Sequence, residues 1–170
     1  MEEQRVTAYV GLGGNMGGEE ALFAHARERM AAWPDISRNA VSELFFTQPR
    51  GDVSQPWFTN QIVSLSCGTT VTPEWLLRAL LDLENGLGRT RDAARRFGPR
   101  RIDLDLLLFG DIVRDTDVLT LPHPRMAERA FVLVPLVSIA PGLTIPGRGP
   151  ARACLDALRH TVENRTIYQE

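Results

Sequence analysis

The segment VTAYVGLGGNMGGEEALFAHARERMAAW, residues 6–33, opens the chain with a strand that leads into a helix. Bulky β-branched and aromatic residues alternate with small ones over residues 6–12, a pattern typical of a half-buried strand. Apolar residues then recur at helical spacing at Leu22, Ala26, Met30 and Trp33. Pro34 ends this pattern, so we predict a strand over 6–12, a glycine-rich turn over 13–18 and a helix over 19–33.

The glycines that follow the first strand do not form a dinucleotide-binding fingerprint. Gly11 and Gly13 match the first two glycines of G-x-G-x-x-G, but the third position falls on Met16. A tight strand-to-helix turn is the better interpretation.

The rest of the chain continues this alternation of strands and helices. Thr72 and Pro73 are a helix cap and first-turn residue ahead of a leucine-rich run. We predict strands over 37–46 and 58–67 joined by a long loop over 47–57, a helix over 73–85, a strand over 101–109 with a short return strand at 112–113, and helical pieces over 124–130 and 152–161. The order strand, helix, strand, strand, helix, strand predicts an α+β fold of the ferredoxin-like kind, with helices packed on one face of an antiparallel sheet and a C-terminal elaboration.

Size and composition predict one domain over residues 1–170, since 44% of the residues are hydrophobic. The charged N-terminus does not resemble a signal peptide, and the longest apolar stretch, 131–140, is far shorter than the roughly 20 residues that span a bilayer. Cys67 and Cys154 are widely separated and show no metal-ligand spacing, so we expect two ordinary buried thiols. We expect a cytoplasmic protein, a monomer, with no membrane partner.

Charge excludes several classes of function. The formal net charge of -2 gives no general attraction to nucleic acid. The basic residues are all arginine, and the lack of lysine excludes a Walker-A loop, a protein-kinase site and Schiff-base chemistry. Six arginines cluster in one short segment, at positions 89, 91, 95, 96, 100 and 101.

Asp103 and Asp105 lie directly after this cluster, two residues apart in a predicted strand. Both carboxylates should therefore lie on one face, with Cα atoms roughly 6.5 Å apart, while residues 102, 104, 106 and 108 take the other face and 107 and 109 continue the aspartate face. Two carboxylates at this spacing suit a pair of magnesium ions about 3.5 to 4 Å apart that bridge phosphate oxygens. Arginines beside them suit a polyphosphate, although structural Asp-Arg ion pairs at a sheet edge explain the pattern equally well.

The longer string RFGPRRIDLDLL, residues 96–107, resembles the signature of 6-hydroxymethyl-7,8-dihydropterin pyrophosphokinase, a folate-pathway enzyme that transfers pyrophosphate from ATP. Supporting segments are AYVGLGGN at 8–15, QPWFTN at 55–60, Glu84 ahead of GRTR at 88–91, and LPHP at 121–124. The resemblance covers about residues 6–147.

This resemblance implies a role for particular residues. Asp103 and Asp105 are expected to hold two Mg²⁺ ions that bridge ATP, the co-substrate, and the pterin hydroxymethyl group, with Arg91 and Arg100 assisting catalysis. The residues implied around the nucleotide are Glu84, Arg91, Arg96, Arg100, Thr120, His123 and Arg129. The residues implied around the pterin are Thr47, Phe58, Asn60 and Phe131, with the two aromatic rings stacked on the heterocycle and the Asn60 amide on its edge.

The chain also departs from the family pattern. The family usually has Gly-Ser-Asn at 13–15 and a residue such as aspartate at Trp57. Val118 replaces an arginine of some members, Phe97 replaces a frequent tryptophan, and the 91–96 loop is one residue longer than is common. The first two departures lie outside the proposed chemistry, Val118 and Phe97 imply altered nucleotide contacts, and the longer loop leaves the correspondence of Arg95 and Arg96 to the family's arginines open.

Two other functions fit parts of the sequence. Another two-metal phosphotransferase or nucleotidyltransferase on the same scaffold would use the same aspartates. A ferredoxin-like RNA-binding module is the alternative from a different class, but it should show a basic surface and aromatic residues on its central strands.

Overall fold

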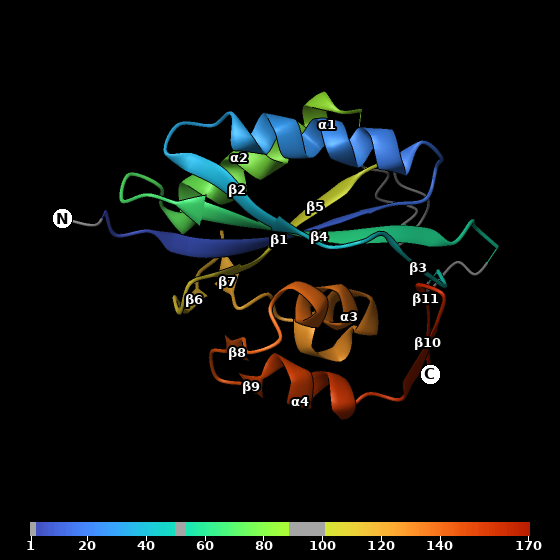
Figure 1. Ribbon diagram of the computed structural model, residues 1–170. Coiled ribbons are helices and arrows are strands. Elements are labelled where there is room, and N and C mark those ends of the chain that lie inside the picture. The colour runs from blue at the N-terminus through green and yellow to red at the C-terminus, as the bar shows by residue number, and fades with distance from the viewer. Residues whose placement is uncertain (1–2, 50–53, 89–100) are drawn as a thin grey trace.

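The computed structural model describes residues 3–49, 54–88 and 101–170, and it contains a central seven-stranded sheet (Figure 1). The strands follow the order β10-β11-β3-β4-β1-β5, and β2 also pairs with β4. Their bounds are Val6–Gly14 (β1), Ile36–Val41 (β2), Phe45–Thr47 (β3), Phe58–Cys67 (β4), Asp103–Phe109 (β5), His160–Glu163 (β10) and Thr166–Gln169 (β11). Two small hairpins, Arg114–Asp115 with Thr120–Leu121 (β6, β7) and Thr144–Ile145 with Gly149–Pro150 (β8, β9), lie outside the sheet.

The predicted fold class is confirmed. Helices α1 (Glu19–Ala31) and α2 (Pro73–Gly86) connect the strands in the expected order, and β1 pairs antiparallel with both β4 and β5. Thr72 caps α2 by accepting the Trp75 N–H at 3.1 Å, as its sequence predicts. The predicted strand 37–46 is in fact two strands, because the backbone ladder to β4 is interrupted at Ser42, whose side-chain hydroxyl accepts the Ile62 N–H at 3.0 Å.

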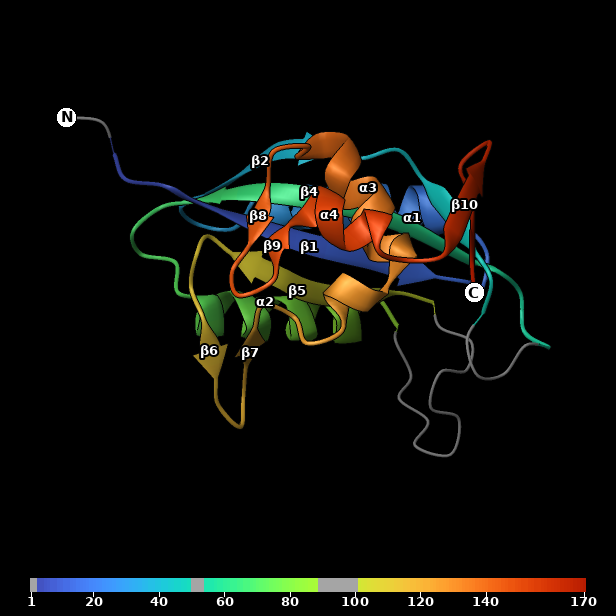
Figure 2. The ribbon, with the colours of Figure 1, turned by 90° about the horizontal axis from the view of Figure 1, so that it is seen from below.

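Helices cover both faces of the sheet, whereas the sequence predicted one covered face. One core lies under α1 and α2, and a second core lies under α3 (Ala130–Ile139) and α4 (Ala151–Asp156). Figure 1 shows α1 and α2 on one side of the sheet and α3 and α4 on the other, and Figure 2 shows α3 and α4 across β4 and β1. The C-terminal elaboration is therefore a third layer.

Two C-terminal elements differ from the prediction. Most of the apolar stretch 131–140 lies in α3, which spans Ala130–Ile139. The short 3-10 helix η2 (Met126–Glu128) precedes it, where the sequence predicted a helical piece over 124–130. The piece predicted over 152–161 ends at Asp156, and the chain then forms the β10–β11 hairpin. Its turn residues Asn164 and Arg165 both have positive φ, the geometry of a type I′ hairpin turn.

A β-bulge changes the predicted facing of β5. Val10 pairs with Leu106 and Tyr9 pairs with Leu108, so Leu107 is an extra residue on β5. Beyond it the alternation reverses: Leu108 lies in the core under α3 and Phe109 in the core under α1 and α2. The predicted faces of the side chains are therefore correct for residues 102–107 and wrong for residues 108 and 109.

The first strand is longer than predicted, because Gly13 and Gly14 continue β1 instead of starting the turn. A Cβ atom on Gly14 would lie 2.5 Å from the Arg101 carbonyl oxygen, so only glycine permits this close approach of β1 to the start of β5.

Cys67 is buried, as predicted, and burial raises the pKa of its thiol to about 11; Cys154 is only partly buried. In the part of the chain described, no helix is long and apolar enough to cross a membrane.

Candidate active site

Asp103 and Asp105 lie on β5, at one edge of the sheet, and both side chains are partly exposed. Their partners across β1 are Gly13 and Gly11, which carry no side chains. The two carboxylates therefore lie on the same face of the sheet, as the period-two pattern predicted, with no side chain opposite them on β1.

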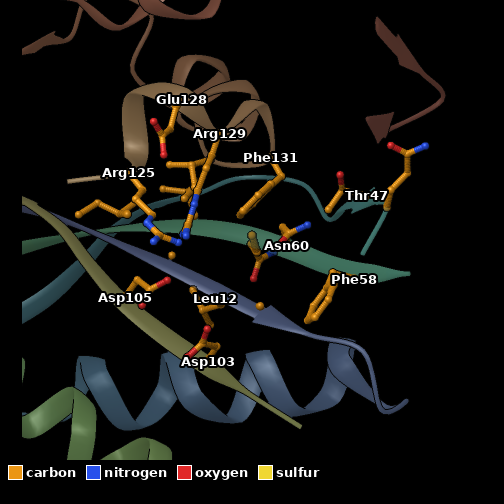
Figure 3. Close-up of a pocket in the computed structure, with 17 residues that line it drawn as sticks. Leu12, Thr47, Phe58, Asn60, Asp103, Asp105, Arg125, Glu128, Arg129 and Phe131 are labelled. Carbon is orange, nitrogen blue, oxygen red and sulfur yellow. The ribbon is translucent and has the colours of Figure 1, made fainter. Parts of the chain in front are cut away.

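A cavity of about 340 Å³ lies between this face of the sheet and the η2–α3 segment. Its walls include both aspartates and all four residues predicted around the pterin: Thr47, Phe58, Asn60 and Phe131. Figure 3 shows these side chains around one space, with the two phenyl rings coming from β4 and α3. Gly11 and Gly13 line the cavity, so the missing side chains leave room above β1.

Asn60 holds an unsatisfied hydrogen-bond donor against this cavity. Asn60 is 7% exposed, and its Nδ2 atom has no hydrogen-bond partner among the described residues. A buried donor without an acceptor costs about 1–3 kcal/mol. A ligand that brought an acceptor to this amide would remove that cost.

A second cavity, of about 370 Å³, lies along the outer edge of β5 beside α2. It shares Asp103, Asp105 and Arg129 with the first cavity, so these three residues stand at the boundary between the two. The residues predicted around the nucleotide that line this second cavity are Glu84, Thr120, His123 and Arg129, and the exposed Val118 lines it as well.

Glu84 is 1% exposed, and its carboxylate accepts the Leu104 N–H at 2.8 Å. Leu104 stands between the two aspartates on an edge strand, so this bond ties β5 to α2 at the site. Glu84 thus lines the second cavity and also fixes the strand that carries the aspartates.

His123 is held as a neutral imidazole. Burial, together with the positive charges of Arg129 and Arg125, lowers the pKa of its side chain to about 4, while Asp103 opposes the shift. Its Nδ1 atom accepts the Arg125 N–H at 3.2 Å, so the ring proton is on Nε2. Near pH 7 His123 therefore has one N–H to donate.

Arg91, Arg96 and Arg100 lie outside the described residues. Two functional candidates that the sequence prediction missed are Arg125 and Glu128, which line the first cavity. Arg125 and Arg129 extend from the η2 region toward the aspartates in Figure 3. The four-residue spacing of these arginines after the His123-Pro124 segment was the signal that could have identified Arg125.

The donor set at the aspartates suits a hard cation that brings other oxygen ligands with it. Within residues 3–49, 54–88 and 101–170, no three His, Cys, Asp or Glu side chains are grouped to hold a metal ion. Mg²⁺ is commonly bound by one or two carboxylates together with water and substrate phosphates, so Asp103 and Asp105 fit Mg²⁺ in the presence of a polyphosphate.

Residues 9–141 match the sequence profile of 7,8-dihydro-6-hydroxymethylpterin-pyrophosphokinase. The chain belongs to this family. The resemblance stated from the sequence is confirmed, and so is the enzyme class, an ATP-dependent pyrophosphokinase.

Curated relatives named 2-amino-4-hydroxy-6-hydroxymethyldihydropteridine pyrophosphokinase agree with this assignment. The protein from Methylorubrum extorquens is 46% identical over 82% of this chain and 86% of its own length. The Pseudomonas aeruginosa protein is 41% identical over 84% of this chain and 85% of its own, and the Bacillus subtilis protein is 40% identical over 78% and 77%.

Solved structures show the same fold. The crystal structure of Plasmodium falciparum HPPK-DHPS with pteroate superposes with a TM-score of 0.65 at 12% identity, covering 99% of this chain and 48% of that chain. A second HPPK-DHPS structure, in complex with substrates, gives a TM-score of 0.67 at 11% identity over 97% and 48%. This chain spans about half the length of these solved chains.

Two of the segments that resemble the family meet in space. The buried Asn15 side chain donates from Nδ2 to Gln55 Oε1 and to the Pro56 carbonyl, both at 2.9 Å. This contact joins the end of β1 to the loop that leads into Phe58. The position of Phe58 in the cavity wall therefore depends on both the 8–15 segment and the 55–60 segment.

Proposed function

We propose that the protein transfers pyrophosphate from ATP to the hydroxymethyl group of 6-hydroxymethyl-7,8-dihydropterin, a step of folate biosynthesis that yields AMP and the pterin diphosphate. The observation that carries this proposal is the position of Asp103 and Asp105 at the boundary of two cavities. One cavity has two aromatic walls and a buried amide, and the other has a neutral imidazole and an arginine. The reacting groups of two substrates would meet at the aspartates.

The first cavity is assigned to the pterin. Phe58 and Phe131 are available to stack on a flat heterocycle, and an aromatic contact adds about 0.5–1.5 kcal/mol beyond burial. The unpaired Asn60 Nδ2 would donate to an acceptor on the edge of the ring. Thr47 and the neighbouring Gln48 line the same wall and complete the enclosure.

The second cavity is assigned to the nucleotide. His123 would donate its Nε2 proton to a phosphate oxygen, and neutrality suits it to this task without adding a charge. Arg129 lies in both cavities and would bind the phosphate that moves from one substrate to the other. Thr120 and Glu84 line the cavity wall, and Arg91, Arg96 and Arg100 remain proposed phosphate ligands.

Asp103 and Asp105 would hold two Mg²⁺ ions, which neutralise phosphate charge and lower the pKa of the substrate hydroxyl. The hydroxyl oxygen of the pterin bonds to the β-phosphorus of ATP, and the bond from that phosphorus to the oxygen bridging the α-phosphate breaks. AMP leaves with the bridging oxygen, and the hydroxyl proton passes to solvent. Arg125 and Arg129 would offset the charge on the transferred group, and the cavity walls would exclude water.

The test is to incubate the protein with ATP, Mg²⁺ and 6-hydroxymethyl-7,8-dihydropterin and to separate the products. We expect AMP and the pterin diphosphate in equal amounts. ADP with a pterin monophosphate would contradict pyrophosphoryl transfer, and pyrophosphate with an adenylylated pterin would indicate a nucleotidyltransferase.

A further inference from the structure

Three consecutive residues of the C-terminal strand β11 contact segments that form or adjoin the walls of the first cavity. This strand lies beyond residue 141, where the match to the family profile ends. It pairs in parallel with β3, with Thr166 opposite Phe46 and Ile167 opposite Thr47. The other pairs of the sheet are antiparallel among the strands described, so the hairpin is an addition to one edge of the sheet.

Ile167 and Tyr168 make the first two contacts. The Ile167 side chain is fully buried under α3, and its carbonyl accepts the Thr47 hydroxyl at 3.3 Å. The Tyr168 ring meets the Trp57 ring edge to face, with centroids 5.7 Å apart. Trp57 directly precedes Phe58, so these contacts fix the β3 wall and the entry to the β4 wall.

Gln169 makes the third contact, on the backbone around Arg129. Its Oε1 accepts the Ala130 N–H and its Nε2 donates to the Glu128 carbonyl, both at 2.8 Å. Arg129, the residue between these two peptide groups, is the N-cap of α3 and caps it with no side-chain hydrogen bond. The side chain of Gln169 therefore satisfies the first N–H of α3 from a distant strand.

The two hydrogen bonds of Gln169 hold the backbone next to Arg129 and Phe131, two residues that would touch substrates. Arg129 lines both cavities, and its guanidinium lies 5.5 Å from the centroid of the Phe131 ring, which lines the first. The direction of both side chains depends on the backbone at Glu128, Arg129 and Ala130. Gln169 fixes the peptide groups on both sides of Arg129.

We propose that β11 is a positioning strand for the pterin cavity and that Gln169 is the positioning residue that orients Arg129 and Phe131. This inference rests on the proposed function for the identity of the ligand. Gln169 itself does not line either cavity, so its effect on binding would act through the two residues it orients.

The test compares Gln169→Leu, which removes both hydrogen bonds, with Gln169→Glu, which keeps the acceptor for Ala130 and loses the donor to Glu128. Glu163→Gln, an exposed position on β10 of the same hairpin, is the control. The measurements are the Kd of the dihydropterin by calorimetry, kcat and KM for both substrates, and hydrogen exchange of the Ala130 amide.

We expect Gln169→Leu to raise the Kd and the KM for the dihydropterin about tenfold, since two hydrogen bonds are lost. The KM for ATP should change less, because Thr120 and His123 line the second cavity from positions ahead of the backbone that Gln169 binds. The Ala130 amide should exchange faster. Gln169→Glu should fall between Gln169→Leu and the wild type, because a carboxylate is favourable at a helix N-terminus.

Wild-type Kd, KM and Ala130 exchange in Gln169→Leu would overturn the inference. A fall in melting temperature with unchanged Kd and KM would also overturn it, since β11 would then stabilise the fold without affecting pterin binding. If Gln169→Leu does not fold, Gln169→Glu decides between weaker and unchanged pterin binding. Failure of the proposed function is separate: the wild-type protein itself would then not bind or pyrophosphorylate the dihydropterin.

Discussion

Asp105 is the residue whose loss should cost activity without costing stability. Asp105→Ala removes one of two proposed metal ligands, and we expect turnover to fall on the order of a thousandfold. The fold should persist, because the side chain is partly exposed and the neighbouring Asp103 carries a like charge. Product formation and thermal unfolding measure the two effects.

Asp111→Ala is the matched control, since Asp111 is an exposed aspartate in the turn after β5. It should keep full turnover. If Asp105→Ala also kept its turnover, the two aspartates of β5 would be structural ion-pair partners, the alternative that the Asp-x-Asp pattern left open.

Replacing Asn60 should weaken pterin binding while keeping or raising the stability of the protein. Asn60→Leu replaces a buried amide whose Nδ2 has no partner with an apolar side chain of similar size. We expect the free energy of unfolding to stay the same or to rise by about 1 kcal/mol, because an unsatisfied donor is removed. Binding of the dihydropterin should weaken about tenfold or more, because the donor to the ring is lost.

Chemical denaturation and calorimetry test this prediction. Thr59→Val is the control, because Thr59 is the preceding residue of β4 and does not line the cavity. Unchanged pterin binding in Asn60→Leu would mean that the amide does not meet the ligand.

Among the elements, β5 depends on α2 for the position of its aspartates. The Leu104 N–H at this sheet edge is satisfied by the buried Glu84 carboxylate at 2.8 Å. Glu84→Leu leaves this N–H without that acceptor, so we expect a loss of about 2–3 kcal/mol in the free energy of unfolding and a fall in kcat. Glu84→Gln keeps an oxygen acceptor and should lose less of both.

Urea unfolding and steady-state kinetics of the two Glu84 variants provide the measurement. Equal stability of Glu84→Leu and the wild-type protein would show that the bond from Leu104 contributes nothing to the anchoring of β5. A loss of stability with full kcat would show that the aspartates do not depend on it.

The elements that the sequence predicted well are those whose periodicity is local. The alternation over 102–107 put both aspartates on one face, and the Thr72 cap placed the start of α2. The bulge at Leu107 was not predictable, because it is set by pairing with β1 and residues 106–109 of β5 are all apolar, so they show no alternation of their own. The prediction of one strand over 37–46 was wrong for a similar reason, since the Ser42 side chain accepts the Ile62 N–H of β4 and interrupts the backbone pairing there.

The C-terminal layer was harder to predict because its helices and strands depend on distant partners. Helix α3 is apolar on nearly every side and contains Pro135, so it shows no amphipathic period. Strand β11 is defined by its parallel pairing with β3, more than a hundred residues earlier. The family resemblance supplied the four pterin residues, which come from β3, β4 and α3, and no spacing rule brings those elements together.

In the whole molecule, the two cavities adjoin each other, and one set of side chains lines both. Asp103, Asp105 and Arg129 line both cavities, so a ligand in one cavity changes the surroundings of a ligand in the other. Coupling between two sites is a single free energy and must be equal in both directions. The arrangement therefore predicts that the nucleotide and the pterin each change the protein's affinity for the other by the same factor.

We expect a non-hydrolysable ATP analogue with Mg²⁺ to increase the affinity for the dihydropterin about fivefold or more, and the pterin to increase the affinity for the analogue by the same factor. Positive coupling follows because cations held by the aspartates would draw the phosphates and the hydroxymethyl oxygen to one place. Calorimetric titration of each ligand, with and without the other, measures the factor. Chelation of Mg²⁺ should abolish it, since the shared carboxylates would then repel both ligands' oxygens. Independent binding of the two ligands in the presence of Mg²⁺ would mean that the shared residues do not connect the cavities.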